Sequence, residues 1–443
     1  MRTAELVWDE MPTSQETRRE VDVVILGATG SVGQAMSSYF SVNAPPGLRW
    51  AMCGRPKSNV QKLLTDLVTM HGPRSPPRLM HADVSDPESL RRVAAKTAVI
   101  LTSIGPYTKY GEAVVVACIE EGAHYVDITG EVWWVAEMRA KYGERARAAG
   151  VCLVSFAGYD CVPFELSALL AHRTLMKGGE RLASMECLTK FDGGGFPPGT
   201  MLTLLNIFSI GFSRTLRGCA NYIPASERVS LVRDLMLLFL PSWSRQKCGL
   251  TVMEGMGAVA CCIVHSSAPV LGYPGVAFNS RFDLPLGGGV SPLAFFTLWG
   301  IVPVSLVYAC AAMSTVPALL GMLVLLYVPP VQDLIAKLIP KLGYKGNLGV
   351  TTTVRGRGVG ANGNVVNTKL VFMGDAGIYL TAQCACETAL AMVHMVDMAH
   401  MVERLHAGSS QAPLPAGFTT PGPAVGEALL VRLASAGVVV EVG

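Results

Sequence analysis

Apolar runs and amphipathic stretches alternate along the first 155 residues of the chain. The run at 23–26 is short and rich in β-branched residues, which is typical of a buried parallel strand. Similar runs predict strands at 48–53, 79–82, 98–103, 124–127 and 151–155. Helical spacing predicts helices at 31–40, 59–70, 111–121 and 135–149, and another that opens at 86–88. Because strands and helices alternate, we predict an α/β fold with six strands in one doubly wound parallel sheet.

The second part of the chain has a different pattern. Strands are expected at 185–191, 252–264, 275–282, 351–357, 365–373 and 438–441, and helices at 164–175, 201–212, 381–405 and 425–435. The pair 351–357 and 365–373 alternates as antiparallel strands do, with a turn at 361–364. A loop is expected at 413–423. The change of pattern at 158–163 marks the expected crossing into a second domain.

The turn between the first strand and the first helix is typical of dinucleotide binding. Gly27 allows a tight turn, Gly30 lets a pyrophosphate approach the backbone, and Gly33 lets the helix pack closely on the sheet. The free N–H groups at the start of the helix would face the phosphates. We therefore predict a Rossmann sheet, with an unliganded structural turn as the alternative. The predicted cofactor-binding residues of this turn are Gly27, Ala28, Thr29, Gly30, Ser31, Val32 and Gly33.

Residues at the ends of the next strands predict which dinucleotide is bound. An NAD enzyme places an acid after the second strand to bind the ribose hydroxyls. This chain has Arg55 there, which suits a 2′-phosphate, so we predict NADP(H) in preference to NAD(H). The alternative is a surface arginine. Asp83 is a candidate for adenine contact, and Gly105 and Pro106 form a turn in the expected ligand crevice.

Reduction of an enoyl or carbonyl group needs a proton donor besides the hydride of the cofactor. The candidate catalytic residues lie at sheet ends or at the domain crossing, and they are Tyr107, Asp127, Tyr159 and Asp160. A tyrosine hydroxyl stays protonated at neutral pH, which favours the two tyrosines. Each of the four could instead be structural. No metal site is predicted, because the twelve cysteines show no CxxC spacing, and we expect reduced thiols in a cytosol-facing protein.

Composition separates this chain from most soluble enzymes. The net charge is +3 and no basic run stands out, so nucleic acid is not an expected partner. Charged residues make up 16% of the chain, against about 25% in soluble domains. No charged residue occurs from 284 to 332. Residues 1–20 mix acidic and basic side chains without an apolar core, so we expect a loose arm rather than a signal peptide.

The uncharged stretch at 284–332 predicts contact with a membrane or lipid-droplet surface. The part at 293–313 would be about 31 Å long as a helix, enough to cross a bilayer core, but Pro303 should kink it. The part at 318–328 would cover only about 16 Å. An apolar helical hairpin that dips into one leaflet fits these lengths better than two spans. The alternative is a hairpin buried in the second domain or at the interface of a homodimer.

Taken together, these motifs resemble the saccharopine dehydrogenase-like oxidoreductase family. The resemblance rests on residues 27–33, 53–55, 105–107, 125–131, 158–163 and 417–422. It implies a Rossmann domain, an inserted α/β domain of mixed sheet, and a C-terminal segment that returns to the first domain. The expected divisions are an N-terminal arm at 1–20, a Rossmann domain at 21–160, a second domain at 161–405 that includes the apolar hairpin, and the C-terminal segment at 406–443.

The family resemblance implies two quite different activities. Saccharopine enzymes act on a tricarboxylic amino acid, whereas a lipid-associated branch includes trans-acting enoyl reductases and lipid-droplet proteins. The long apolar stretch makes this chain more similar to the lipid branch. We expect an NADP(H)-dependent oxidoreductase that reduces a small-molecule or lipid substrate at a lipid-droplet or membrane surface. A non-catalytic lipid-surface protein with a cofactor fold and a saccharopine dehydrogenase are the alternatives.

Overall fold

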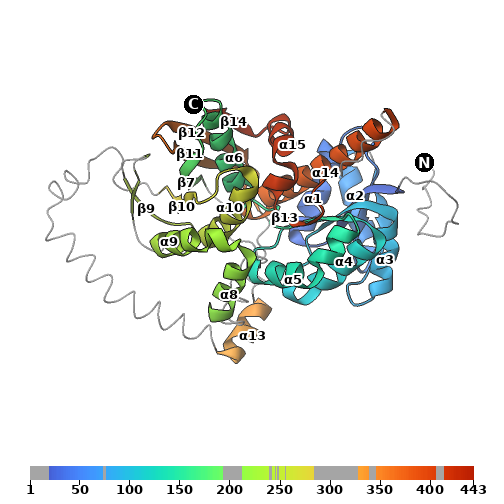
Figure 1. Ribbon diagram of the computed structural model, residues 1–443. Coiled ribbons are helices and arrows are strands. Elements are labelled where there is room, and N and C mark those ends of the chain that lie inside the picture. Colours follow the sequence, from blue (N-terminus) through green and yellow to red (C-terminus); the bar gives the residue numbers. More distant parts are fainter. Residues whose placement is uncertain are drawn as a thin grey trace.

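Two seven-stranded sheets form the framework of the computed structural model (Figure 1). The structure describes residues 19–72, 76–192, 212–238, 242–244, 246, 249–254, 256–283, 328–338, 346–405 and 414–443. The predicted helix at 201–212, almost all of the predicted arm at 1–20 and most of the predicted hairpin at 284–332 lie outside these residues. Of the hairpin, only residues 328–332 are described, and the helix α13 (Pro329–Leu338) begins there.

The first sheet is parallel throughout and follows the predicted order of elements. Its strands are β1 (Val21–Leu26), β2 (Trp50–Cys53), β3 (Arg78–Met80), β4 (Thr97–Thr102), β5 (His124–Asp127), β6 (Cys152–Val154) and β13 (Gly417–Thr419). They lie in the order β13-β6-β5-β4-β1-β2-β3. The order reverses between β1 and β4, which is where doubly wound sheets bind their ligands.

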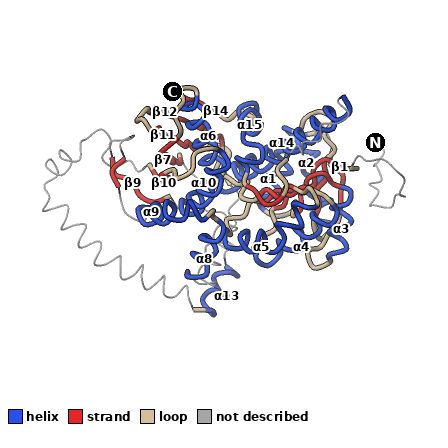
Figure 2. Tube along the Cα trace, in the orientation of Figure 1, coloured by secondary structure: helices blue, strands red, loops and turns tan. Residues whose placement is uncertain are grey.

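Helices cover both faces of the first sheet, as Figure 2 shows. They are α1 (Ser31–Asn43), α2 (Lys57–His71), α3 (Pro87–Lys96), α4 (Tyr107–Glu121) and α5 (Val132–Ala148). The predicted N-cap of α3 is confirmed, because the Asp86 carboxylate accepts a hydrogen bond from the Glu88 N–H at 3.2 Å. The strands themselves are buried along their whole length, except at Arg78, Ala98, His124, Phe418 and Thr419. Continuous apolar runs form the strands because both faces are covered.

The second sheet is mixed. Its strands are β7 (Leu182–Phe191), β8 (Ser242–Ser244), β9 (Gly249–Met253), β10 (Ala277–Phe282), β11 (Thr351–Gly360), β12 (Val365–Met373) and β14 (Val439–Val442). They lie in the order β14-β12-β11-β7-β10-β9-β8, where β7 and β10 are parallel and the other pairs are antiparallel. The predicted pairing of 351–357 with 365–373 is confirmed.

The remaining helices connect and cover the two sheets. They are α6 (Val162–Met176), α8 (Phe212–Tyr222), α9 (Arg228–Leu238), α10 (Gly257–Leu271), α14 (Thr381–Leu405) and α15 (Pro421–Ser435), with short turns η1 (Ala225–Glu227) and η3 (Ala376–Leu380). Among the described residues, one helical stretch, Ala376–Asp397, is long and apolar enough to cross a membrane. Because 83% of its most apolar window is buried inside the molecule, it is a core helix.

Two predictions of local structure are wrong, and so is the predicted number of strands in the first sheet. The stretch 252–264 is not a strand, because β9 ends at Met253 and α10 begins at Gly257. This run of small and branched residues is buried almost throughout, and such a run has no period that separates helix from strand. The predicted loop at 413–423 contains β13 and the first turn of α15, so the first sheet has seven strands rather than six.

Candidate functional site

The glycine turn after β1 is shaped by close backbone contacts. The N–H groups of Gly27 and Ala28 donate to the Cys53 carbonyl of β2 at 2.9 and 3.1 Å, and Gly27 has a φ of +90°. A Cβ atom at Gly33 would lie 2.1 Å from the Gly27 carbonyl oxygen, so only glycine fits there. A Cβ atom at Gly30 would meet just that same oxygen, at 3.4 Å. Packing therefore explains two of the three glycines, and the protein itself does not require the third.

A cleft of about 300 Å³ opens beside this turn, at the carboxyl ends of β1, β2, β3 and β4. The lining residues that the sequence predicts are Gly27, Thr29, Gly30, Arg55 and Gly105. The lining residues that it missed are Gly54, Ala82, Val84, Ser103, Ile104 and Tyr110. Most of these directly follow a strand, and that position is the signal that could have found them. The cleft lies at the topological switch point, where a dinucleotide is expected.

Other predicted cofactor residues lie around the cleft rather than in its wall. Ala28 is fully buried beneath the turn, and Ser31, Val32 and Gly33 begin α1. Pro106 is the N-cap residue of α4, and its peptide bond with Gly105 is cis. These residues therefore shape the cleft through the backbone.

Asp83 holds Arg55 at the rim of the cleft. The Arg55 Nη1 lies 2.5 Å from the Asp83 Oδ2, and the other carboxylate oxygen accepts bonds from the Ser85 hydroxyl and N–H at 2.6 and 2.9 Å. The hydrogen bonds from Ser85, followed by that from Arg55, lower the pKa of Asp83 to about 2. Since a guanidinium has five N–H donors, this pair leaves donors free for a phosphate. Asp83 therefore orients the guanidinium of Arg55, the residue predicted to bind the 2′-phosphate.

Two of the four predicted catalytic residues make structural hydrogen bonds. The buried Tyr107 hydroxyl donates to the Thr102 carbonyl at 3.0 Å. The buried Asp127 carboxylate accepts from the N–H groups of Thr129 and Phe156 at 3.0 and 3.1 Å and from the Ser155 hydroxyl at 2.9 Å. Burial raises the pKa of Asp127 to about 6, although these bonds oppose the shift. Both side chains tie strand ends to the loops that follow them.

Glu131 is a functional candidate that the sequence did not single out. Its carboxylate is fully buried and accepts the N–H groups of Tyr107 and Thr108 at 2.9 and 3.0 Å. These groups belong to the first turn of α4, so the carboxylate completes that helix N-terminus and fixes the turn at Gly105.

Tyr159 and Asp160 lie where the chain passes from β6 to α6. Tyr159 is fully buried among the rings of Phe164, Phe191 and Phe372, and its hydroxyl has no hydrogen-bond partner in the described part of the chain. Asp160 is partly exposed, and burial raises its pKa to about 6. Both residues thus stand past the carboxyl end of β6, on the far side of the switch point from Arg55.

Glu254 is a second acidic residue in this region, and we call Asp160 and Glu254 the carboxyl pair because the charge of Asp160 acts on Glu254. Glu254 directly follows β9, is buried, and lies near the hydroxyl of Ser280, with Oε2 and Oγ 3.5 Å apart. Burial raises the pKa of Glu254 to about 8, and the charge of Asp160 contributes to the increase. The charges of Glu254 and Asp160 also add to the effect of burial in raising the pKa of Tyr159. No local motif marks Glu254, so sequence reasoning could not connect it with residues almost a hundred positions earlier.

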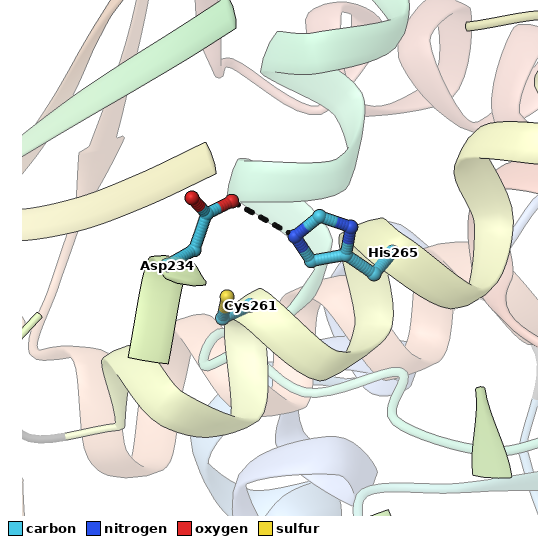
Figure 3. Close-up of side chains that lie close together, drawn as sticks. All are labelled: Asp234, Cys261 and His265. Carbon is cyan, nitrogen blue, oxygen red and sulfur yellow. Dashed lines mark hydrogen bonds and ion pairs between the residues drawn. The ribbon is translucent and has the colours of Figure 1, made fainter. Parts of the chain in front are cut away.

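A second group of buried polar residues lies between α9 and α10 (Figure 3). The ligand atoms of Asp234, Cys261 and His265 all lie within 4.8 Å of one another, which is close enough to hold a metal ion. The His265 ring is already bonded on both sides, however, with Nε2 3.0 Å from Asp234 and Nδ1 3.3 Å from Glu227. The Arg233 guanidinium also bonds Asp234, at 2.7 Å. These contacts satisfy the polar atoms of Asp234 and His265. The positive charge of the neighbouring Arg233 also disfavours the binding of a metal ion.

Another cleft, of about 860 Å³, lies between α5 and α8, away from the glycine turn. Its charged lining residues are Arg139, Arg147, Arg217, Glu137 and Glu144. The opposite charges nearly balance, and Arg147 is already paired with Glu144. The chemistry of a cofactor site is concentrated in the smaller cleft instead.

Comparisons with known proteins agree with this geometry. Residues 23–154 match the family model described as the saccharopine dehydrogenase NADP binding domain, which confirms the predicted NADP(H) cofactor. The solved structure of apo saccharopine dehydrogenase (L-Glu forming) from Saccharomyces cerevisiae covers 96% of this chain and 99% of its own, with a TM-score of 0.51 and 14% identity. At that identity the likeness concerns the fold alone, and it confirms the predicted combination of a Rossmann sheet with a second mixed sheet.

Curated relatives match about half of this chain and about half of their own length. A Mycobacterium tuberculosis protein named for trans-acting enoyl reductase activity is 34% identical over 44% of this chain and 45% of its own. A lipid droplet localized protein of Caenorhabditis elegans is 35% identical over 42% and 44%. A saccharopine dehydrogenase-like oxidoreductase of Rattus norvegicus is 32% identical over 47% and 51%. Residues 23–154 are therefore a saccharopine dehydrogenase NADP-binding domain, and over about half of its length the chain is similar to proteins named saccharopine dehydrogenase-like oxidoreductases.

Proposed function

We propose that this protein is an NADPH-dependent reductase of an apolar or lipid-linked substrate and that it acts at a membrane or lipid-droplet surface. The observation that carries the reductase assignment is the cleft at the switch point, in which the glycine turn faces Arg55. Bound NADPH supplies a hydride. The residues of this chain must then bind the cofactor, orient the substrate and deliver a proton.

The carboxyl pair beyond β6 is our proposed source of that proton. With a pKa of about 8, Glu254 is mostly protonated at neutral pH. A buried protonated carboxyl can donate to the atom next to the carbon that receives the hydride, which is the oxygen of a carbonyl group or the α-carbon of an enoyl group. Asp160 is partly exposed and can return a proton to Glu254 from solvent. In this scheme Tyr107, Asp127 and Glu131 position the loops around the site.

The lipid assignment rests on composition and on the names of relatives. Charged residues are scarce, and the stretch 284–332 contains none. Relatives that share the first domain are named for trans-acting enoyl reductase activity and for lipid-droplet localisation. A saccharopine dehydrogenase would need several positioned cations for three carboxylates. At the carboxyl pair the described residues instead provide acids and aromatic rings, which favours an uncharged substrate.

NADPH consumption with a panel of substrates tests this proposal. Enoyl and keto lipids should be turned over, and saccharopine should not. The Glu254→Gln variant should keep NADPH binding and lose most of the turnover. The control Glu137→Gln, in the cleft between α5 and α8, should behave as wild type. Turnover of saccharopine alone would overturn the substrate assignment. NADPH binding without turnover of any lipid would favour the non-catalytic alternative.

A further inference from the structure

The helix α9 has several apolar side chains on its exposed face. Val229 is 81% exposed, Val232 48%, Met236 69% and Leu237 51%. These positions recur with helical spacing and so lie on one face. The opposite, buried face carries Leu231, Asp234 and Leu238. A surface helix ordinarily turns its apolar stripe toward the core, so α9 presents an unusually large apolar face to the outside.

Buried hydrogen bonds hold α9 in this orientation. The Asp234 carboxylate accepts from the Phe278 N–H of β10 at 2.7 Å and bonds His265 of α10 at 3.0 Å. Turning the valines inward would pull Asp234 out of this network and leave His265 beside Glu227 alone. Breaking such a buried ionic network is strongly destabilising. The exposed face is therefore imposed by the fold, and it is not a local displacement of one helix.

Basic residues border the apolar face. The exposed positions of α9 also include Arg228 and Arg233, and none of its exposed positions is acidic. Arg228 donates from Nε to the Ala220 carbonyl of α8 at 2.9 Å, which holds its stem along the surface. A helix with apolar side chains and flanking arginines on one outward face is typical of binding in the plane of a lipid interface.

The uncharged stretch of the sequence follows a strand that contacts α9. β10 packs on α9, and the described residues after β10 end at Asp283. The sequence that follows, 284–327, contains no charged residue. When the chain is described again, in α13, Leu334 and Leu338 are also exposed. The uncharged sequence thus follows the strand on which α9 packs.

We propose that the outward face of α9 docks on an anionic phospholipid surface. We call this face the α9 patch, and it consists of Val229, Val232, Met236 and Leu237 with Arg228 and Arg233 next to them, of which Arg233 is already paired with Asp234. The inference rests on the proposed lipid-surface function and assigns residues to it. Four side chains on one short helix form a patch far smaller than the roughly 800 Å² per partner of a stable protein dimer. A bilayer interface needs no matching shape, and it can take up the apolar side chains while its anionic headgroups neutralise Arg228, which has no carboxylate partner among the described residues.

Co-sedimentation with vesicles tests the patch. Vesicles of phosphatidylcholine with phosphatidylserine are mixed with the full chain, with Val229→Asp/Met236→Asp, and with the control Val68→Asp/Met70→Asp. The control residues are exposed apolar residues in and near the last turn of α2, 48% and 65% exposed. The α9 variant should bind at least tenfold more weakly, since two side chains lose their burial. The control should bind as wild type. All three should bind NADPH equally, because the substituted side chains are exposed.

The outcomes separate this inference from the proposed function. Equal vesicle binding by wild type and the α9 variant would overturn the α9 patch and leave the lipid-surface function intact. No vesicle binding by wild type would overturn both. A change in oligomeric state with unchanged vesicle binding would assign the face to a second copy of the chain and would also overturn the proposal.

Two further variants test whether the charge of Arg228 contributes to vesicle binding and whether the α9 patch inserts into the bilayer. Arg228→Glu should weaken binding to vesicles with phosphatidylserine at least fivefold and binding to pure phosphatidylcholine much less. A tryptophan introduced by Val229→Trp should be quenched by lipids with brominated acyl chains, unlike one introduced by Val68→Trp. Equal quenching at the two positions would place α9 outside the interface.

Discussion

Replacing Arg55 with alanine is the sharpest test of the cofactor site. The Arg55 side chain is 56% exposed and pairs with Asp83 through a single nitrogen, so its other N–H groups can reach a 2′-phosphate. A hydrogen bond to a charged group contributes about 1.5–3 kcal/mol. Solvent screens an exposed group, which places the expected loss near the lower limit, at about 1.5 kcal/mol or roughly tenfold in Kd.

The assay is fluorescence titration with NADPH and NADH at one fixed salt concentration. Arg55→Ala should bind NADPH about tenfold more weakly and NADH almost as wild type does. Arg92→Ala serves as the matched control, because it removes an equally exposed arginine from α3, away from the cleft. Asp83→Asn should give a smaller and likewise NADPH-selective loss, since it releases Arg55 without removing it. An unchanged ratio of the two affinities in Arg55→Ala would refute the assignment of the 2′-phosphate site.

Three other perturbations have expected outcomes. Gly33→Ala should lower the Tm and abolish NADPH binding, since its Cβ would lie 2.1 Å from the Gly27 oxygen. Gly30→Ala should keep the Tm and weaken only NADPH binding, and equal losses of Tm in the two variants would contradict this reasoning. Turnover should fall as pH rises through about 8, where Glu254 loses its proton. The stability of the wild type should also fall as pH rises from about 4.5 to 8, because the folded pKa of Glu254 is raised above its unfolded value. A Glu254→Gln variant with the same pH profiles would exclude this role. His265→Ala should destabilise the protein by about 1–3 kcal/mol in urea unfolding, because it removes one hydrogen-bond partner from each of two buried carboxylates that keep their other partners. A chelator should not change the Tm, and a chelator-dependent Tm would indicate a metal ion instead.

The sequence by itself determined the elements whose signals are local. The strand β1, the glycine turn and α1 follow one another within about twenty residues, and each is identified by composition and spacing. The same holds for the β11–β12 hairpin and for the helix α14, whose bounds match the prediction. Arg55 could be assigned from its place after β2, because parallel strands put their carboxyl ends at one edge of the sheet.

Only the tertiary structure decided which distant residues meet. The carboxyl pair joins Asp160 with Glu254, which no spacing rule connects. Likewise, β13 lies beside β6 although more than 250 residues separate them in the chain. Burial could not be predicted for α10, because its apolar residues show no period. It could not be predicted for α9 either, because Asp234 lies on the buried face of this helix and several apolar residues lie on the exposed face. Local propensity describes a segment on its own, whereas pairing, burial and pKa depend on what the rest of the chain places around it.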